Sequence, residues 1–396
     1  MLNIIKKYGS PLFVYDGDMI LKRYRELHEY INWPKLKILY AIKANSNPDI
    51  LKMLKEHNAF LDTVSPGEVY LALKLGYSPD RILFTANNMT DNEMHYIKKI
   101  GVLINIDSIS RLEKYGRAYP GTEVCLRFNP DVIAGFHEKV QTGGDLSKFG
   151  ILLDDVETVK ALVEKYRLKV VGLHEHSGSG ITEKEQVYRS MKALLNIATK
   201  ENFPKLRFID FGGGFKVPYK PEEKRIDYRT FGKKIVGIFE DFCKEYGKEL
   251  EMYFEPGKYI VAEAGRLLIE VNTVKNNHGH RIAGTNSGFP HLIRPILYGA
   301  YHHIQNLSNP DGQQLKYDVA GNICESGDIF ARQRDIPQIR EGDILEIRNA
   351  GAYCYAMGGF YNLRPMPAEV FTFKGRTRLS TKARSFEELV DNWLGI

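Results

Sequence analysis

The stretch "KILYAIKA" (residues 37–44), followed by "NSNPDILKMLKEHNA" (45–59), contains one complete strand-and-helix unit. Its first part is a short apolar run typical of a buried strand. Asn47 suits the N-cap of a helix, and Pro48 suits the first helical position because its missing N–H would have no partner inside the helix. We therefore predict a strand, a short turn and a helix, in that order.

The same unit recurs along the first two-thirds of the chain. Seven further apolar runs follow, at 60–65, 81–86, 102–107, 123–128, 169–176, 206–211 and 251–255. Eight such units in about 230 residues match the length of a closed (β/α)8 barrel. A doubly wound open sheet is the alternative for the same pattern. We predict the α/β class, with a TIM barrel over residues 28–262.

The pattern changes beyond residue 260. Strand-like segments such as "RLLIEVNTV", "YDVAGNI" and "AEVFTF" are separated there by Gly, Asn and Asp turns. The segment "PLFVYD" (11–16) also has the character of a strand and could join them. We expect a second, mostly β domain of the sandwich or Greek-key kind, formed by residues 1–27 and 263–396.

Charge and cysteine content restrict the function. The 396 residues carry 55 Lys and Arg against 49 Asp and Glu, a net charge of +6 without a basic stripe. This favours small anionic ligands over nucleic acid. Four dispersed cysteines and the lack of a basic-then-apolar leader predict reduced thiols in the cytoplasm. We predict no bound metal. We also predict no membrane helix, because no apolar run is long enough.

Chemically distinctive residues follow the predicted strands at one end, where barrel enzymes place their active sites. They are Lys43, "SPGE" (65–68), Arg127, "HSGSG" (176–180), "GGG" (212–214) and "EPG" (255–257). Three successive glycines let backbone N–H groups approach an anion closely, and Ser179 could bind the same anion. An ordinary tight turn is the alternative reading of the glycines.

Three of these side chains suit a pyridine ring that carries an aldehyde. Lys43, partly desolvated by Ala41 and Ala44, could have a lowered pKa and form an imine, although a barrel lysine is more often an ion-paired group. Glu255 could hold a proton on the ring nitrogen, and His176 could stack on the ring. A structural glutamate and a satisfied strand-end histidine are the alternatives. Their combination with an anion-binding turn favours a pyridoxal phosphate site.

The motifs "YAIKAN", "SPGE", "HEHSGSG", "FIDFGGGF", "EPGKYIVAEAG", "LIRPILYGAYH", "CESGD" and "GAYCYAMGGFYNLRPMPAEV" carry a family resemblance over nearly the whole chain. The sequence resembles the fold type III pyridoxal phosphate decarboxylases. The resemblance implies decarboxylation of meso-2,6-diaminopimelate to L-lysine, the last step of lysine biosynthesis. Ornithine, arginine and carboxynorspermidine are alternative substrates. A racemase on the same barrel and a non-catalytic regulatory relative are the alternatives from other classes.

The resemblance also implies individual roles. Lys43 would hold the cofactor as an imine, His176 would stack on its ring, and Glu255 would pair with the ring nitrogen. The remaining residues implied for the cofactor are Arg127, Ser179, Gly212, Gly213, Gly214, Pro256, Gly257, Lys258 and Tyr353. Lys258 stands where the family usually has arginine, so the charge is kept but the two-pronged contact is lost.

For the substrate, the resemblance implies contacts from the second domain. Arg294 and Tyr298 would hold a carboxylate, and Tyr353 and Lys258 would also reach the substrate. In "CESGD", Cys324 would be the proton donor and Glu325 would bind the distal amine. From the residues alone, this segment is more simply an acidic turn, and Arg294 an ion pair. In the family the cysteine loop crosses from a partner subunit, which implies a homodimer with active sites at the subunit interface.

Overall fold

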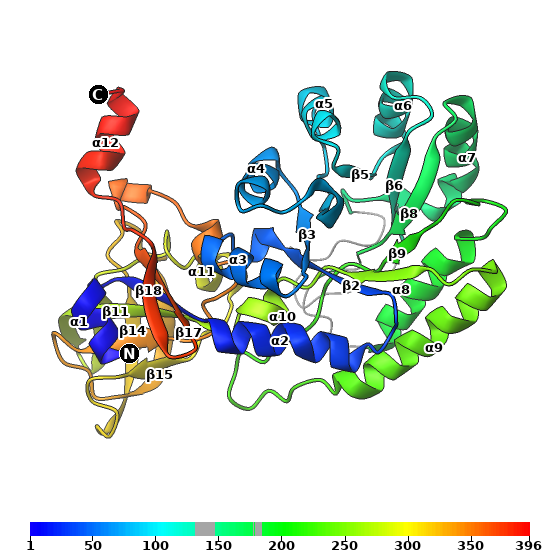
Figure 1. Ribbon diagram of the computed structural model, residues 1–396. Helices are drawn as coiled ribbons and strands as arrows, with labels where there is room; N and C mark the ends of the chain where they lie inside the picture. The colour runs from blue at the N-terminus through cyan, green and yellow to red at the C-terminus, as the bar shows by residue number, and fades with distance from the viewer. Residues whose placement is uncertain (131–146, 177, 179–183) are drawn as a thin grey trace.

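A computed structural model describes residues 1–130, 147–176, 178 and 184–396. The barrel and the mostly β domain lie side by side, with helix α2 (Gly17–Tyr30) leading from one to the other (Figure 1). Within the described residues, no helix is both long and apolar enough to cross a membrane.

The predicted barrel is confirmed. Its strands are hydrogen-bonded in the order β5-β4-β3-β2-β10-β9-β8-β6, and β5 also pairs with β6, which closes the sheet and excludes the open alternative. A short strand β7 extends β6 on the outside. The strands are β2 (Leu36–Ala41), β3 (Phe60–Thr63), β4 (Ile82–Phe84), β5 (Leu103–Ile106), β6 (Glu123–Asn129), β7 (Ile151–Leu152), β8 (Lys169–His174), β9 (Phe208–Asp210) and β10 (Glu251–Phe254).

Helices surround the closed sheet. Asn47 caps α3 as predicted, because its side chain accepts hydrogen bonds from the backbone N–H groups of Asp49 and Ile50, and Pro48 takes the first helical position. The other helices around the barrel are α4 (Pro66–Lys74), α5 (Asp91–Ile100), α6 (Ile109–Ala118), α7 (Val156–Lys165), α8 (Lys184–Ile197), α9 (Tyr228–Tyr246) and the short α10 (Lys258–Val261), with α3 spanning Pro48–Glu56.

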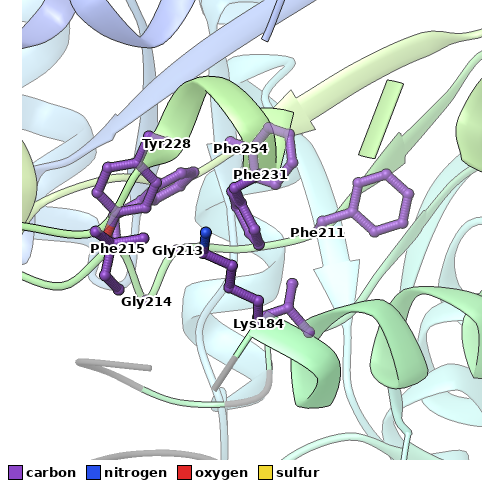
Figure 2. Close-up of a pocket in the computed structure, with 10 residues that line it drawn as sticks. Lys184, Phe211, Gly213, Gly214, Phe215, Tyr228, Phe231 and Phe254 are labelled. Carbon is purple, nitrogen blue, oxygen red and sulfur yellow. The ribbon is translucent and has the colours of Figure 1, made fainter. Parts of the chain in front are cut away.

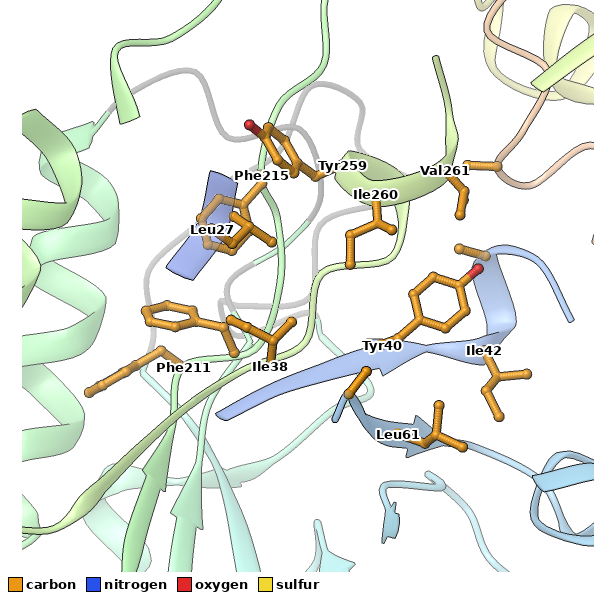
Figure 3. Packing of buried hydrophobic residues seen from close by; sticks show 14 of the residues in the cluster. Leu27, Ile38, Tyr40, Ile42, Leu61, Phe211, Phe215, Tyr259, Ile260 and Val261 are labelled. Atoms are coloured by element: carbon orange, nitrogen blue, oxygen red, sulfur yellow. The ribbon is translucent and has the colours of Figure 1, made fainter. Parts of the chain in front are cut away.

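Strand alternation divides the barrel between an outer and an inner core. Ile38, Tyr40 and Ile42 of the first strand and its turn belong to the large cluster between sheet and helices (Figure 3). Leu39, between them, belongs to a separate cluster. Each of the remaining seven barrel strands contributes one residue to it: Phe60, Leu83, Leu103, Cys125, Val171, Phe208 and Tyr253. This second cluster is an apolar floor inside the barrel.

A layer of polar side chains follows the floor. In six strands the residue two positions after the floor residue is polar and buried: Asp62, Thr85, Asn105, Arg127, Asp210 and Glu255. Because alternate residues of a strand face the same side, these side chains enter the barrel at its carboxyl end. The floor thus supports the polar layer from which the functional site is built.

The second domain is mostly β, as predicted, and includes the N-terminal strand. Its order is β15-β14-β12-β11-β1-β17-β18, with β16 joining β11 to β13. Strand β1 (Leu12–Asp16) runs parallel to β17 and antiparallel to β11. The other strands are β11 (Gly265–Asn277), β12 (His280–Thr285), β13 (Ile304–Asn306), β14 (Gln314–Ala320), β15 (Ile329–Pro337), β16 (Ile344–Ile347), β17 (Ala368–Phe373) and β18 (Arg376–Thr381).

Three helices accompany this sheet: α1 (Leu2–Tyr8), α11 (Arg294–Tyr298) and α12 (Phe386–Leu394). Helix α12 ends the chain and projects away from the rest of the molecule (Figure 1). The domain limits at residues 28 and 262 stay a prediction.

Two glycines of α9 provide a test of the packing between this helix and α2. A β-carbon at Gly232 would lie 1.9 Å from the carbonyl oxygen of Tyr30, whereas one at Gly237 would meet nothing within 4 Å. Because a backbone carbonyl cannot move aside easily, we expect Gly232→Ala to destabilise the protein by about 1–3 kcal/mol. The midpoint of thermal unfolding should fall.

The matched control is Gly237→Ala. Alanine is favoured over glycine inside a helix by about 1 kcal/mol, so this variant should unfold at or above the temperature of the wild type. Equal midpoints for the two variants would contradict the packing described here.

Candidate active site at the carboxyl end of the barrel

Lys43 lies in a single 3-10 turn, Ile42–Ala44, directly after β2. Its ammonium group forms a salt bridge with the carboxylate of Asp62, which is fully buried on β3. Burial would lower the pKa of Lys43, but the carboxylates of Asp62 and Glu255 outweigh burial and raise it. The predicted lowering of this pKa is therefore wrong for the chain as it stands, because the sequence pattern does not reveal Asp62 as a partner.

The turn that carries Lys43 is tied to the second domain. The backbone N–H of Tyr353 donates to the carbonyl oxygen of Ala44 at 2.9 Å, and the side chain of Asn45 donates to the carbonyl of Gly351 at 2.9 Å. Tyr353 has a φ of 56°, a backbone conformation that a non-glycine residue adopts only when its surroundings impose it. The two contacts bring Tyr353 of "GAY" to the mouth of the barrel.

The turn after β9 requires its glycines. Gly212 and Gly214 have φ values of 64° and 97°. A β-carbon at Gly213 would lie 2.6 Å from the carbonyl oxygen of Glu255, so no larger residue fits. The N–H of Gly213 donates to Nδ1 of His176 at 3.0 Å, which makes Nδ1 an acceptor. Burial lowers the pKa of His176, and both observations indicate a neutral ring.

These segments enclose a pocket with an empty volume of about 370 Å³, which we call the central pocket. Its lining includes nine of the residues predicted for the cofactor, together with Phe215 and Tyr259: Lys43, His176, Gly213, Gly214, Glu255, Pro256, Gly257, Lys258 and Tyr353. Gly212 adjoins the pocket through its contact with His176. Ser179 lies outside the described residues.

Glu255 is buried at the base of the central pocket. Its Oε2 lies 3.2 Å from Nε2 of His174, a residue on β8 that the sequence pattern does not predict. Burial raises the pKa of Glu255, while the charges of Lys43 and Arg127 oppose the rise. Burial also lowers the pKa of His174 well below its ordinary value, so this ring is a neutral hydrogen-bond donor to the carboxylate.

Arg127 is buried on β6 but does not line the central pocket. Its guanidinium group lies 4.6 Å from the centre of the Phe149 ring. Burial lowers the pKa of Arg127, and the nearby carboxylates of Glu255 and Asp107 raise it. The structure therefore gives Arg127 an electrostatic effect on Glu255, not a place on the pocket wall.

Behind the glycine turn is an apolar pocket of about 420 Å³. Phe211, Phe215, Phe231 and Phe254 line it, and Figure 2 shows their rings gathered around Gly213 and Gly214. The aromatic side chains thus give the glycine turn an apolar surrounding on this side.

Another pocket, of about 800 Å³, which we call the Arg294 pocket, adjoins the central pocket through their shared residue Lys258. Its wall includes Arg294 and Tyr298, as predicted for the substrate side. Arg294 is buried, donates to Nε2 of His302 at 3.0 Å, and lies 4.5 Å from the centre of the Tyr219 ring. Among the described residues it forms no salt bridge. A buried guanidinium group without a carboxylate is suited to an anionic ligand.

His302 keeps Arg294 in place. Its Nδ1 donates to the carbonyl oxygen of Arg348 at 2.9 Å, which leaves Nε2 as the acceptor for Arg294. Burial, with Arg294 adding to it, lowers the pKa of His302 to about 3, so the ring stays neutral. His302 ends the motif "LIRPILYGAYH", but the sequence does not indicate its role, because the carbonyl of Arg348 that fixes its ring lies 46 residues further along the chain.

Cys324 and Glu325 lie away from both pockets. They are exposed in the turn between β14 and β15, and neither lines the central pocket or the Arg294 pocket. The backbone N–H of Cys324 donates to the side chain of Asn362 at 2.9 Å. A single chain therefore does not bring the predicted proton donor to Lys43.

Comparison with known proteins agrees with this geometry. Residues 18–262 match the family model "Pyridoxal-dependent decarboxylase, pyridoxal binding domain". Diaminopimelate decarboxylase of Methanothermobacter thermautotrophicus is 42% identical over 98% of this chain and 92% of its own. The enzyme of that name from Escherichia coli K12 is 32% identical over 98% of this chain and 95% of its own.

A solved structure leads to the same group. The crystal structure of diaminopimelate decarboxylase from Helicobacter pylori complexed with L-lysine superposes with a TM-score of 0.91, at 29% identity over the whole of both chains. The lysine, the glycine turn and the buried glutamate at the carboxyl end of the barrel lie within the matched residues 18–262, and the match places the chain in the class of pyridoxal-dependent decarboxylases. The chain belongs to the diaminopimelate decarboxylase family within that class.

Lys258 predicts a pH dependence. Only 8% of its surface is exposed, and burial together with the charge of Arg294 lowers its pKa to about 7. The lysine loses its positive charge as the pH rises through this value. We expect affinity for inorganic phosphate to fall several-fold between pH 7 and 9 in the wild type, as measured by calorimetry.

The control is Lys258→Arg, because arginine stays charged throughout this range. Its phosphate affinity should be nearly constant from pH 7 to 9. A wild type with the same flat profile would show that Lys258 is not the titrating group.

Proposed function

We propose that this protein decarboxylates meso-2,6-diaminopimelate to L-lysine and carbon dioxide, with pyridoxal phosphate as cofactor. The observation that carries the proposal is the adjacency of two pockets: one contains Lys43 and Glu255, and the other contains a buried Arg294 that forms no salt bridge among the described residues. Relatives named for this activity, and the related structure with bound L-lysine, support the substrate.

The residues of the central pocket fit the cofactor. Gly212, Gly213 and Gly214 form a turn, the phosphate cradle, whose first two positions leave no room for a β-carbon. The backbone of Gly213 and Gly214 therefore lines the pocket directly, which suits a phosphate group. When bound, pyridoxal phosphate supplies an aldehyde for the substrate amine and a ring that takes up the electrons left by carbon dioxide. Lys43 would hold the aldehyde carbon, and Lys258, Tyr353, Pro256 and Gly257 would complete the wall.

The protein's own groups would then orient and protonate. Glu255 would hold a proton on the ring nitrogen, because a buried carboxylate stabilises a positive charge beside it. Neutral His176 would lie flat on the ring, fixed by the N–H of Gly213. Asp62 would keep Nζ of Lys43 directed into the pocket through their salt bridge.

Recognition of the far end of the substrate would depend on Arg294. Diaminopimelate carries a second carboxylate that ornithine lacks, so a buried guanidinium group left without an anion discriminates against ornithine. Tyr298 lines the same wall and would bind the same carboxylate. Lys258 lies between the two pockets and would contribute charge to both.

We further propose a homodimer located in the cytoplasm. Cys324 and Glu325 are exposed in one chain, so they would act in the pocket of a second copy. There Cys324 would give a proton to the α-carbon, and Glu325 would bind the distal amine. The location follows from the free cysteines and the biosynthetic reaction proposed.

Activity and absorbance together test the catalytic proposal. Purified protein given pyridoxal phosphate should release carbon dioxide and L-lysine from meso-diaminopimelate and show visible absorbance from the lysine-bound cofactor. Lys43→Ala should lose both. Lys37→Ala changes the other end of the same strand, where Lys37 pairs with Glu251, and should keep both.

Three results would contradict the proposal. Preferential turnover of ornithine would exclude the role of Arg294 in choosing the substrate. Interconversion of enantiomers without carbon dioxide release would identify a racemase. Unchanged turnover in Lys43→Ala would exclude cofactor attachment at this residue.

Mixing of subunits tests the dimer. Lys43→Ala and Cys324→Ala should each have little activity, yet in a reassorted mixture half the dimers are mixed and each has one intact site. We expect about a quarter of wild-type activity to return.

The control mixes Lys43→Ala with His176→Ala. Both changes are on the barrel side of the site, so every site in the mixed dimers stays defective. No recovery in the first mixture, or equal recovery in both, would exclude a shared site.

A further inference from the structure

Asp210 is a fully buried acid at the end of β9, and the proposed reaction assigns it no role. We propose that Asp210 is a positioning residue that stays protonated, donating a hydrogen bond to Glu255 while accepting one from the glycine turn. The inference rests on the proposed function, because Glu255 matters only if it faces the cofactor ring.

Adjacent strands bring the groups together. Asp210 lies opposite His174 in the β8–β9 pairing, and Glu255 follows β10, the next strand. The ligand atoms of His174, Asp210 and Glu255 all lie within 4.8 Å of one another. Oδ1 of Asp210 accepts a hydrogen bond from the N–H of Gly212 at 2.9 Å. Oδ2 of Asp210 and Oε1 of Glu255 are both buried and have no hydrogen-bond partner among the described residues, which is the arrangement that one acid proton between them would satisfy.

Two carboxylates in contact in a buried site cannot both be ionised, so one of them holds a proton. Lys43 and Arg127 stabilise the negative charge of Glu255. Among the described residues Asp210 forms no salt bridge, and burial and the charge of Glu255 raise its pKa well above its ordinary value. The proton therefore belongs to Asp210.

The charges of the polar layer balance under this assignment. Lys43 and Arg127 are positive, Asp62 and Glu255 are negative, and Asp210 and His174 are neutral. An ionised Asp210 would add an uncompensated charge in a fully buried position, which is strongly unfavourable.

This assignment fixes the orientation of the Glu255 carboxylate. Nε2 of His174 holds Oε2 of the Glu255 carboxylate, and the acid proton of Asp210 would hold Oε1, the oxygen that has no other partner among the described residues. Asp210 is also bonded to the first glycine of the turn, so one side chain sets the distance between the carboxylate and the phosphate cradle. That distance must match the length of the cofactor from ring nitrogen to phosphate.

Asn and Ala substitutions separate this role from a charged one. Asparagine supplies an oxygen for Gly212 and an N–H for Glu255, as a protonated Asp210 does, so Asp210→Asn should bind pyridoxal phosphate as tightly as the wild type, with the same absorbance spectrum. Asp210→Ala should raise the dissociation constant about tenfold or more and alter the spectrum, as expected for losing a hydrogen bond to a charged group.

Glu175→Gln is the matched control. Glu175 is a buried acid beside His174 whose pKa burial raises to about 8, but it bonds to Ser190 instead of Glu255. It should bind the cofactor as the wild type does. A loss as large as that of Asp210→Ala would overturn the specific role of Asp210.

Other outcomes are equally decisive. If Asp210→Asn folds by circular dichroism but binds the cofactor poorly, Asp210 acts as an anion and the inference is wrong, even if Asp210→Ala fails to fold. Weaker cofactor binding by the wild type after EDTA treatment would assign the same three side chains to a metal and also overturn it. A wild type that takes up no cofactor would overturn the proposed function as well.

Discussion

The active site depends on one constraint, the burial of charged side chains where eight parallel strands converge. Asp62, Arg127, Asp210 and Glu255 have little access to water, so each must find its partner inside the protein. Lys43 forms an ion pair with Asp62, and Asp210 and Glu255 share a proton. The apolar floor beneath them makes these interactions strong, because it keeps the local dielectric low. The need to neutralise each buried charge therefore also fixes where these side chains lie.

The second domain completes the site through backbone contacts with the barrel. Asn45 and Ala44, next to Lys43, are bonded to Gly351 and Tyr353 of the distant "GAY" segment. Gly351 approaches the barrel so closely that a β-carbon there would lie 1.8 Å from the carbonyl oxygen of Val261. The lysine turn and the substrate side are thus fixed relative to each other. Lys258, shared by both pockets, is the side chain that connects them.

Most of the fold could be predicted from the sequence, because strand periodicity and the Asn47–Pro48 helix start are local signals. Lys43, Glu255 and the glycine turn could be predicted because they follow strands in recognisable motifs. The motifs do not single out Asp62, His174 and Asp210, since these residues lie within the strands and not in the turns that follow them. Counting in steps of two from the floor residues would have revealed Asp62 and Asp210. The raised pKa of Lys43 depends on Asp62 and Glu255, and the orientation of the His302 ring toward Arg294 depends on the distant carbonyl of Arg348. No local sequence pattern encodes such contacts.

The apolar floor and the polar layer lie one above the other along the barrel axis, so the residues that provide packing are separated from those that provide the chemistry. Residues such as Leu39, Leu83 and Phe208 contribute packing alone, one step below the chemistry. Exchange of one aliphatic side chain for another there would alter how firmly the barrel holds together without changing any proton donor or acceptor. The lower half of the barrel can therefore adapt to a hotter or colder environment while the reaction above it stays the same.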